Sequence, residues 1–322
     1  MAFNADEIID RRSLRKKISF WRVAAFVLVS ALIVSLFFSS GLVKKFGKQN
    51  AAHIARVKIT GTITNDEPLL KLLKKVKDNK NIKAVVLNIS SPGGTTVGGE
   101  AIFEAVRAIS EEKPIVTSVG TLAASAGYMI ASASDHIVAH RSSIVGSIGV
   151  LFQFPNFTGL MDKVGIKYET IKSSPLKAEP SPFNETTPEE RAAIDRVVKD
   201  SYQWFVELVA ERRDMSKAEV LKLADGTIYS GGQSMANGLI DALGGEEKAI
   251  EWLVAEKDID EALKVIEWKP TRPTDNIFGN PAAFVWLANK FGIKLDDGDA
   301  ARWQNYISQR LFLDGLQSVW VN

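Results

Sequence analysis

The chain of 322 residues is long enough for one large domain or two ordinary domains with a well-buried core. Its formal net charge of +2 gives no general electrostatic case for binding nucleic acid. Cysteine is absent, which excludes disulfides, thiolate metal sites and a cysteine nucleophile, and the three histidines lack the spacing of metal ligands. The chain thus offers no thiolate or histidine metal site, and we expect no metal and no other cofactor.

Near the N-terminus, residues 23–43 form a run of 21 residues without a charge. As a helix this run spans about 31 Å, close to the hydrocarbon thickness of a bilayer, and it is apolar on every side. Six basic residues precede it and three lysines follow it, a bias that places the N-terminus in the cytoplasm. A cleaved signal peptide is the alternative, although its apolar region is usually shorter.

The pattern thus predicts a single-pass anchor in the cytoplasmic (inner) membrane. We expect a basic cytoplasmic segment at 1–22, the anchor at 23–43 and a linker at 44–54. The rest of the chain is then exported, to the periplasm or to the outside of the cell.

Beyond the linker, short β-branched runs alternate with helical patterns. Strands are predicted at 55–63, 83–90, 114–120 and 136–140, and helices at 67–78, 98–112 and in the small-residue stretch from residue 121. This alternation is typical of βαβ units around a parallel sheet. The turns at 91–94 and 120–124 follow two of these strands, and α/β folds usually place their sites at such carboxyl ends. We expect one domain at 55–265, with a C-terminal extension at 266–322.

The second half of the domain opens with a polar loop. Residues 173–190 hold several prolines and turn formers, which predict a loop. Thr187 and Glu190 have the spacing of a capping box and start a helix that is predicted to reach about Asp214. A further helix is predicted from Ser216, and a turn, a helix and a turn within 224–245.

Ser125 is a candidate nucleophile because it opens the predicted small-residue helix. The first amides of a helix lack intrahelical acceptors, and the positive end of the helix dipole suits an oxyanion. Gly93 and Gly94 follow the preceding strand and offer an N–H donor where a side chain would obstruct a substrate. There is a non-catalytic alternative. The small residues around Ser125 are then explained by close packing of the helix, and Gly93 and Gly94 by an ordinary turn.

A serine nucleophile needs a base to take its proton. His136 and His140 lie on a predicted strand and suit a packed or surface role better than a triad. A lysine base must be neutral, which requires a lysine pKa to fall from about 10.4 toward 7–8 by burial. Lys177, flanked by Pro175 and Leu176, lies in an apolar stretch that favours this. A solvated surface charge is the simpler explanation of any single lysine, so these residues alone leave the base open.

Five ordered blocks carry a family resemblance. They are LNISSPGG (87–94), TLAASAGYMIA (121–131), VGSIGV (145–150), IKSSPLKAEPSPF (171–183) and ADGTIYSGGQSMANGLIDALGG (224–245). Together they resemble signal peptide peptidase A, a family of membrane-anchored Ser–Lys peptidases with a Clp-protease/crotonase-like fold. The resemblance covers about residues 55–265 and includes the anchor. It implies an α/β fold of repeated ββα units with a parallel sheet.

The resemblance also implies roles for single residues. Ser125 corresponds to the nucleophile and Lys177 to the general base. The backbone N–H groups of the oxyanion hole correspond to those of Gly93, Gly94 and Ala126. The border of the peptide-binding groove corresponds to Gly146, Ser147, Ile148 and Gly149. In similar peptidases the serine and the lysine come from neighbouring chains of a ring, so the resemblance implies a homo-oligomer.

The sequence departs from the family pattern at two of these places. Ala126 stands where the family usually has glycine, and alanine keeps the N–H group. Ala178 stands where an acidic residue usually follows the lysine.

We expect a membrane-anchored serine endopeptidase that degrades cleaved signal peptides and other short apolar peptides. A catalytically silent membrane scaffold of the same fold is one alternative, and covalent labelling of Ser125 by a serine-reactive probe separates it from an enzyme. A crotonase-type acyl-CoA enzyme is another, but export removes the domain from the compartment that contains CoA.

Overall fold

The computed structural model describes residues 21–22, 25–28, 30, 51–272 and 317–319. The chain divides into two compact units, Met1–Ala52 and His53–Asn322, and the fold below is that of the second. Most of the expected membrane span at 23–43 lies outside the described residues, as do the segments at 1–20 and 273–316. Within the described part of the chain, no helix has both the length and the apolar character that a membrane span requires.

An eight-stranded sheet forms the centre of this unit. Its strands are β1 (His53–Thr60), β2 (Ile82–Ser91), β4 (Ile115–Ala124), β5 (His136–Ala139), β6 (Ile144–Gly146), β7 (Ile228–Ser230), β8 (Ala242–Leu243) and β9 (Val265–Trp268). They follow the order β7-β6-β4-β2-β1-β9, with β5 beside β4 and β8 beside β5. Among the described strands of this sheet only β7 pairs antiparallel, with β6. The expected α/β fold with a mostly parallel sheet is confirmed.

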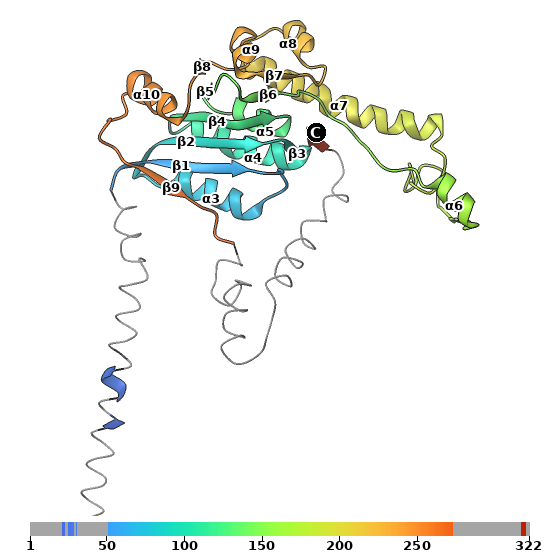
Figure 1. Ribbon diagram of the computed structural model, residues 1–322, viewed down its shortest axis with the longest axis horizontal. Coiled ribbons are helices and arrows are strands. Elements are labelled where there is room, and N and C mark those ends of the chain that lie inside the picture. The colour runs from blue at the N-terminus through green and yellow to red at the C-terminus, as the bar shows by residue number, and fades with distance from the viewer. Residues whose placement is uncertain (1–20, 23–24, 29, 31–50, 273–316, 320–322) are drawn as a thin grey trace, which may run out of the picture. The chain divides into compact units, whose positions relative to one another are not determined.

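Helices cover the sheet and connect its strands (Figure 1). They are α3 (Glu67–Asp78), α4 (Thr96–Ser110), α5 (Ala126–Ser132), α6 (Thr158–Val164), α7 (Pro188–Arg212), α8 (Lys217–Leu223), α9 (Gly231–Ala236) and α10 (Glu246–Lys257). A second, two-stranded sheet pairs β3 (Gly93–Thr95) with β10 (Gln317–Val319).

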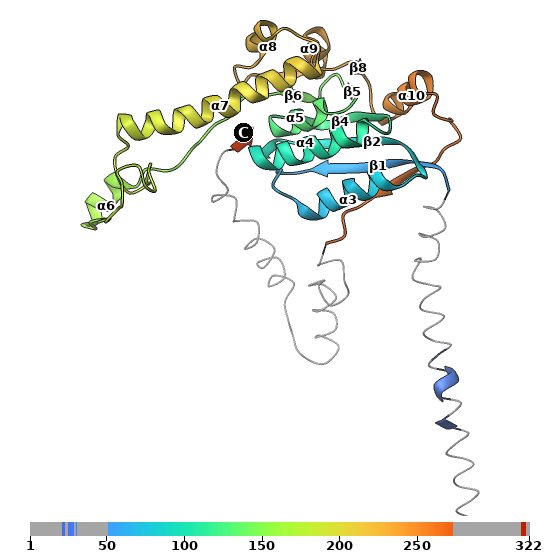
Figure 2. The ribbon, with the colours of Figure 1, turned by 180° about the vertical axis from the view of Figure 1, so that it is seen from behind.

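The central strands are apolar on both faces because both faces are covered. Val85, Leu87 and Ile89 of β2 belong to the large core that includes α3, α4, α5 and α7. The alternate residues Ala84 and Val86 belong to a smaller core with α10. Figures 1 and 2 show α3 and α4 beside the sheet and α10 apart from them. This two-sided burial is typical of parallel sheets with crossover helices.

The predicted start of the long helix is confirmed. Thr187 Oγ1 accepts the N–H of Glu190, and the Glu190 carboxylate accepts the N–H of Thr187, so the capping box is complete. Ser216 begins α8 with the same arrangement. Within 224–245, α9 is present, but the short strands β7 and β8 on either side of it were not predicted.

The end of the strand near residue 120 was predicted wrongly. We expected the strand to end at Gly120, followed by a turn at 120–124 and a helix opened by Ser125, but β4 continues to Ala124; α5 begins at Ala126, directly after Ser125. The reason is tertiary: the last residues of β4 pair in parallel with β6, and this pairing outweighs the weak strand propensity of alanine. Ser125 is therefore the single residue between strand and helix.

Between β6 and α7 the chain leaves the sheet and forms an extension, residues 151–187, which we call the arm. Figures 1 and 2 show α6 and the segment beside it beyond the end of the sheet, at the N-terminal end of α7. None of the α6 residues is buried. The arm exposes many large apolar side chains, namely Phe152, Phe154, Phe157, Leu160, Val164, Ile166, Tyr168, Ile171, Leu176 and Phe183.

Candidate active site

Ser125 has a backbone conformation that is unusual for any residue but glycine. Its φ is 54° and its ψ is −120°, in a sharp turn from β4 into α5. Such conformations cost on the order of 1–3 kcal/mol and persist where the surrounding structure imposes them. Here the Ser125 N–H donates to the Gly146 carbonyl at 2.8 Å, and the Ser125 carbonyl accepts the N–H of Met129 at 2.9 Å. A strained strand-to-helix turn of this kind is how several hydrolases present a nucleophilic serine.

Helix α5 holds this turn close to the neighbouring strands. A Cβ atom added to Gly127 would lie 2.9 Å from the Ser91 carbonyl oxygen, so the helix lies against the end of β2. Tyr128 is fully buried and donates its hydroxyl hydrogen to the Leu239 carbonyl at 2.9 Å. Burial also raises the pKa of this hydroxyl above its usual range, which keeps it a donor. Ala126 is buried at the first position of the helix.

The two glycines after β2 have different partners. Gly93, with a φ of 103°, donates its N–H to Ser91 Oγ at 3.1 Å, and the Ser91 hydroxyl donates to the Gly61 carbonyl at 2.7 Å. The N–H of Gly93 is therefore already engaged within the chain. Of the two predicted donors, Gly94 is the better candidate for a substrate oxygen.

Position 94 accepts only glycine. An added Cβ atom would lie 1.8 Å from the Ile63 carbonyl oxygen, a distance that no side chain tolerates. The close approach comes from main-chain hydrogen bonds: Ile63 N–H donates to the Gly93 carbonyl and Thr95 N–H donates to the Ile63 carbonyl, both at 2.8 Å. Gly94 is thus held in place between these bonds, and its own N–H and C=O face the opposite edge of β3, since successive residues of a strand alternate.

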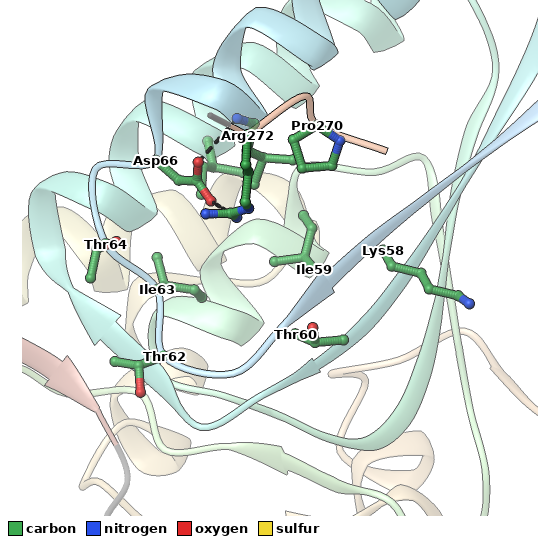
Figure 3. Close-up of a pocket in the computed structure, with 11 residues that line it drawn as sticks. Lys58, Ile59, Thr60, Thr62, Ile63, Thr64, Asp66, Pro270 and Arg272 are labelled. Atoms are coloured by element: carbon green, nitrogen blue, oxygen red, sulfur yellow. Dashed lines mark hydrogen bonds and ion pairs between the residues drawn. The ribbon is translucent and has the colours of Figure 1, made fainter. Parts of the chain in front are cut away.

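The loop that carries Ile63 is itself fastened, as Figure 3 shows. The Asp66 carboxylate accepts the N–H of Leu69 at 3.1 Å as the N-cap of α3, and it accepts from Arg272 Nη2 at 2.6 Å. A small cavity of about 80 Å³ lies here, lined by residues that include Ile63, Asp66, Pro270 and Arg272. The support of β3 therefore includes Arg272, the last described residue of the segment 51–272.

The predicted groove residues lie next to the serine. The Gly146 carbonyl accepts the Ser125 N–H, and a Cβ atom added to Gly146 would lie 3.0 Å from the Tyr229 ring. Ser147, with a φ of 52°, donates its N–H to the Thr227 carbonyl at 2.8 Å. Ile148 is buried and Gly149 is half-buried. The structure thus brings Ser125, β3 and the segment at 146–149 together at one edge of the sheet.

Lys177 lies in the arm, apart from this group. It is exposed, so its apolar neighbours Pro175 and Leu176 do not bury it within a single chain. A cavity of about 390 Å³ borders it, and the lining comes entirely from residues 168–181. Ser125 is not among the lining residues. Within the described part of the chain, this cavity therefore joins Lys177 to its own loop and not to Ser125.

The other lysine of this loop is paired. Lys172 forms an ion pair with Glu179, whose side chain is only 3% exposed, and this hydrogen bond holds the pKa of Glu179 below its usual range. Lys172 is therefore held in an ion pair within the loop, whereas Lys177 is the exposed lysine of the same loop.

His136 does not serve the site. It starts β5 opposite Val116, roughly eight residues or about 26 Å along the strand direction from the end of β4. It stacks on Trp252 with 4.6 Å between ring centroids, and burial lowers its pKa despite the Asp241 carboxylate, which opposes the shift. We expected a packed or surface role for His136, and it is a half-buried residue packed on Trp252.

Sequence reasoning missed two residues that position the site. Ser91 carried a detectable signal, because a serine hydroxyl often accepts the N–H two residues later in a turn. Ile63 acts only through its main chain, and no side-chain pattern reports such a contact.

Comparisons with known proteins place the chain in a family. The model of the Clp protease family matches residues 53–150 and that of peptidase family S49 matches residues 107–260. The first match agrees with the parallel sheet and gives the fold its class, a Clp protease-like α/β fold. The chain belongs to peptidase family S49, and it is a peptidase.

Several curated relatives support this assignment. A protein of Synechocystis sp. named "Putative protease slr0021" is 38% identical over 209 residues, which are 64% of this chain and 75% of that protein. A protein of Enterococcus faecium named "Putative signal peptide peptidase SppA" is 37% identical over 240 residues, 73% of this chain and 67% of that protein. "Protease 4" of Haemophilus influenzae is 32% identical over 230 residues, 67% of this chain but only 37% of its own length.

Proposed function

We propose that the chain is a serine endopeptidase in which Ser125 is the nucleophile and Lys177 the general base. The observation that carries the proposal is the strained backbone of Ser125 between β4 and α5, directly beside a strand in which position 94 admits only glycine. Strain at a polar residue next to a site kept free of side chains is typical of a catalytic turn.

The chemistry follows from this arrangement. Ser125 Oγ attacks the carbonyl carbon of the scissile peptide bond while Lys177 Nζ, in its neutral form, takes the hydroxyl proton. The N–H groups of Gly94 and Ala126 donate to the oxyanion of the tetrahedral intermediate. Lys177 then gives the proton to the leaving amine. Water, deprotonated by the same lysine, attacks the acyl-enzyme, and the acid product and the free serine are released.

The base reaches the serine from a second copy of the chain in this proposal. Lys177 lies in the arm with Ser125 outside its cavity, and the arm exposes a run of aromatic and aliphatic side chains that a monomer has no reason to leave in water. Association of copies through the arm buries these side chains, and contact with the neighbour desolvates Lys177, which favours the neutral lysine that the mechanism needs. A homo-oligomeric ring accounts for both features.

Membrane attachment and the substrate class complete the proposal. The uncharged run at 23–43 with its flanking basic residues supports an anchor in the cytoplasmic membrane, with residues from about 46 onward in the periplasm or outside the cell. The name of the Enterococcus relative supports cleaved signal peptides, and other short apolar peptides, as substrates. Substrates of this kind are released at the membrane in which the anchor lies.

Complementation between two inactive variants tests the proposal. Ser125→Ala and Lys177→Ala should each reduce cleavage of a fluorogenic apolar peptide by at least about 10³-fold, because each removes a group on which the chemical step depends. Lys163→Ala, in α6 of the same arm, is the matched control and should retain activity.

Mixing the two inactive variants before assembly should restore part of the activity, since some contacts then join an intact serine to an intact lysine. If each single variant is inactive and the mixture is inactive too, both groups come from one chain. Full activity of either single variant, or no covalent labelling of Ser125 by a fluorophosphonate, would refute the dyad and favour a silent scaffold.

A further inference from the structure

Helix α3 and the loop after it carry a concentrated positive charge. Residues 67–83 hold six lysines and two acidic residues, which gives them a formal net charge of +4. Residues 49–322 as a whole carry −4, because nine of the basic and three of the acidic residues of the +2 chain lie within 1–48. A basic segment in an otherwise acidic domain indicates a partner of negative charge.

The lysines of α3 and of the loop point away from the core. The buried residues of the helix form one apolar stripe, made of Leu69, Leu72, Leu73 and Val76. Lys74 and Lys75 lie outside this stripe and are exposed, and Lys80 and Lys83, which follow the helix, are exposed as well. We call Lys74, Lys75, Lys80 and Lys83 the basic face.

Two acidic residues near the basic face have other partners. Glu67 pairs with Lys71 at 2.8 Å. Glu112, at the end of α4, pairs with Lys77 at 3.3 Å. Within the described part of the chain, none of the four lysines of the basic face forms an ion pair with a carboxylate. Their charge is therefore available to a partner outside the chain.

The remaining charges at this end of α3 do not cancel the basic face. The Lys113 ammonium group caps the helix by donating to the carbonyls of Val76 and Asn79, both at 2.8 Å. Asp78, whose charge acts on Lys113, and Glu111, two residues before it, are the exposed acids here. With these three charges included, the basic face keeps a net charge of +3.

The basic face lies beside the start of β1. His53, the first residue of this strand, pairs with Ile82 and donates its N–H to the Asn81 carbonyl at 2.9 Å. Lys80 and Lys83 flank these two residues in the chain. His53 follows the expected anchor by ten positions, and an extended chain of that length reaches at most about 36 Å. A membrane that holds the expected anchor is therefore within reach of the basic face.

The other side of β1 has the opposite charge. Strand β9 pairs with β1 on the side away from β2, and the loop before β9 exposes Asp258, Asp260 and Glu261. Lys264 is the exposed lysine next to them. An anionic surface near the start of β1 therefore attracts the α3 side of this unit and repels the β9 side.

We propose that the basic face binds the anionic headgroups of the membrane and holds the α3 side of the domain against the bilayer. The inference rests on the proposed membrane attachment. Each lysine near an anionic bilayer adds to the attraction, which falls off within a Debye length of about 8 Å at physiological salt. Because the anchor tethers the domain, the effective concentration of the face at the surface is in the millimolar range, and weak binding is enough.

Lysine acetylation of the full-length chain in vesicles tests the inference. The vesicles consist of phosphatidylcholine alone or with about 30% phosphatidylglycerol, and the reagent does not cross the bilayer. If the basic face contacts anionic headgroups about four-fifths of the time, its lysines should react about fivefold more slowly in the anionic vesicles. Lys222, on α8 at the opposite side of this unit in Figures 1 and 2, should react equally in both. About 0.5 M NaCl should abolish the difference.

A pair of variants shows whether the four lysines cause this protection. The test variant carries Lys74→Gln, Lys75→Gln, Lys80→Gln and Lys83→Gln. The control variant removes the same charge from other exposed positions, with Lys199→Gln, Lys217→Gln, Lys222→Gln and Lys248→Gln. Lys71, on the same helix as the basic face, is the reporter in both. Anionic lipid should protect Lys71 in the parent chain and in the control variant but not in the test variant.

Flotation of the vesicles separates failure of the inference from failure of the membrane attachment. If the chain floats with both vesicle types but the basic face reacts equally in both, the inference is overturned and the attachment stands. Equal protection of Lys71 in the two variants would overturn the inference as well. Flotation with anionic vesicles alone would refute the anchor and still support the basic face, whereas flotation with neither would refute both.

Discussion

Replacing Ser125 by glycine should stabilise the fold relative to replacing it by alanine. Both variants remove the hydroxyl and both are expected to be inactive, so they differ only in the Cβ atom. At a φ of 54° and a ψ of −120°, a residue with a Cβ is strained by about 1–3 kcal/mol. Glycine avoids this strain but loses about 0.5–1 kcal/mol through its greater freedom in the unfolded chain. The glycine variant should therefore be more stable by about 1 kcal/mol.

Ser132, in the same helix, provides the matched control. It is buried like Ser125, and its hydroxyl donates to the Met129 carbonyl at 2.7 Å, but it has an ordinary position near the end of α5. There the order should reverse, with Ser132→Gly less stable than Ser132→Ala by about 1 kcal/mol, because glycine is a poor helix residue. A comparison of the two pairs removes the effect of losing a hydroxyl.

Thermal unfolding of the four full-length variants measures the difference. A change of about 1 kcal/mol corresponds to about 2–4 °C in Tm for a domain of this size. The reasoning is refuted if Ser125→Gly melts at or below the temperature of Ser125→Ala, since the backbone at this position would then carry no strain that a Cβ atom causes.

Two further predictions concern position 94 and pH. Gly94→Ala should destabilise the fold by at least about 2 kcal/mol, because its Cβ atom meets the Ile63 carbonyl. It should also lower kcat by about 10²–10³-fold, because the N–H donor moves. In the control Gly159→Ala the added methyl group meets open space, so an equal loss of stability there would contradict this explanation. The pKa of His136 is lowered from 6.5 by burial, so between the lowered value and about 6.5 the unfolded chain binds more protons and stability falls as the pH falls through this window. Tm measured from pH 7.5 to 5 should show this fall in the parent chain and less of it in His136→Gln, and equal slopes would exclude His136 as the cause.

Much of the fold was predictable because local patterns and the tertiary structure agree. The helix α3 was predicted at its observed bounds, since its apolar residues recur at helical spacing and all four buried ones face the sheet. The capping boxes at Thr187 and Ser216 identified two helix starts. Short strands such as β7 and β8 escaped prediction, because two or three residues form a strand only through the neighbour with which they pair.

The candidate site was predictable in its residues but not in its geometry. Small residues around Ser125 indicated a place where chains approach closely, but only the backbone angles distinguish a strained turn from a packed helix. The different partners of Gly93 and Gly94 depend on Ser91 and Ile63, which lie on separate segments. The sequence also suggested an apolar setting for Lys177 from its neighbours. Burial depends instead on what lies across from the loop, and Lys177 is exposed.

The main-chain contacts of β3 determine which substitutions the site tolerates. Ile63 supports the strand through its N–H and C=O, so other apolar residues of similar volume can replace it, and proline cannot, because it lacks the N–H that Gly93 receives. Position 94 tolerates no side chain at all. Among sequences with this fold, a peptidase can therefore change the identity of residue 63 without losing its donor, whereas any change at 94 removes it. A glycine lost there is a better sign of lost activity than any difference in the surrounding core.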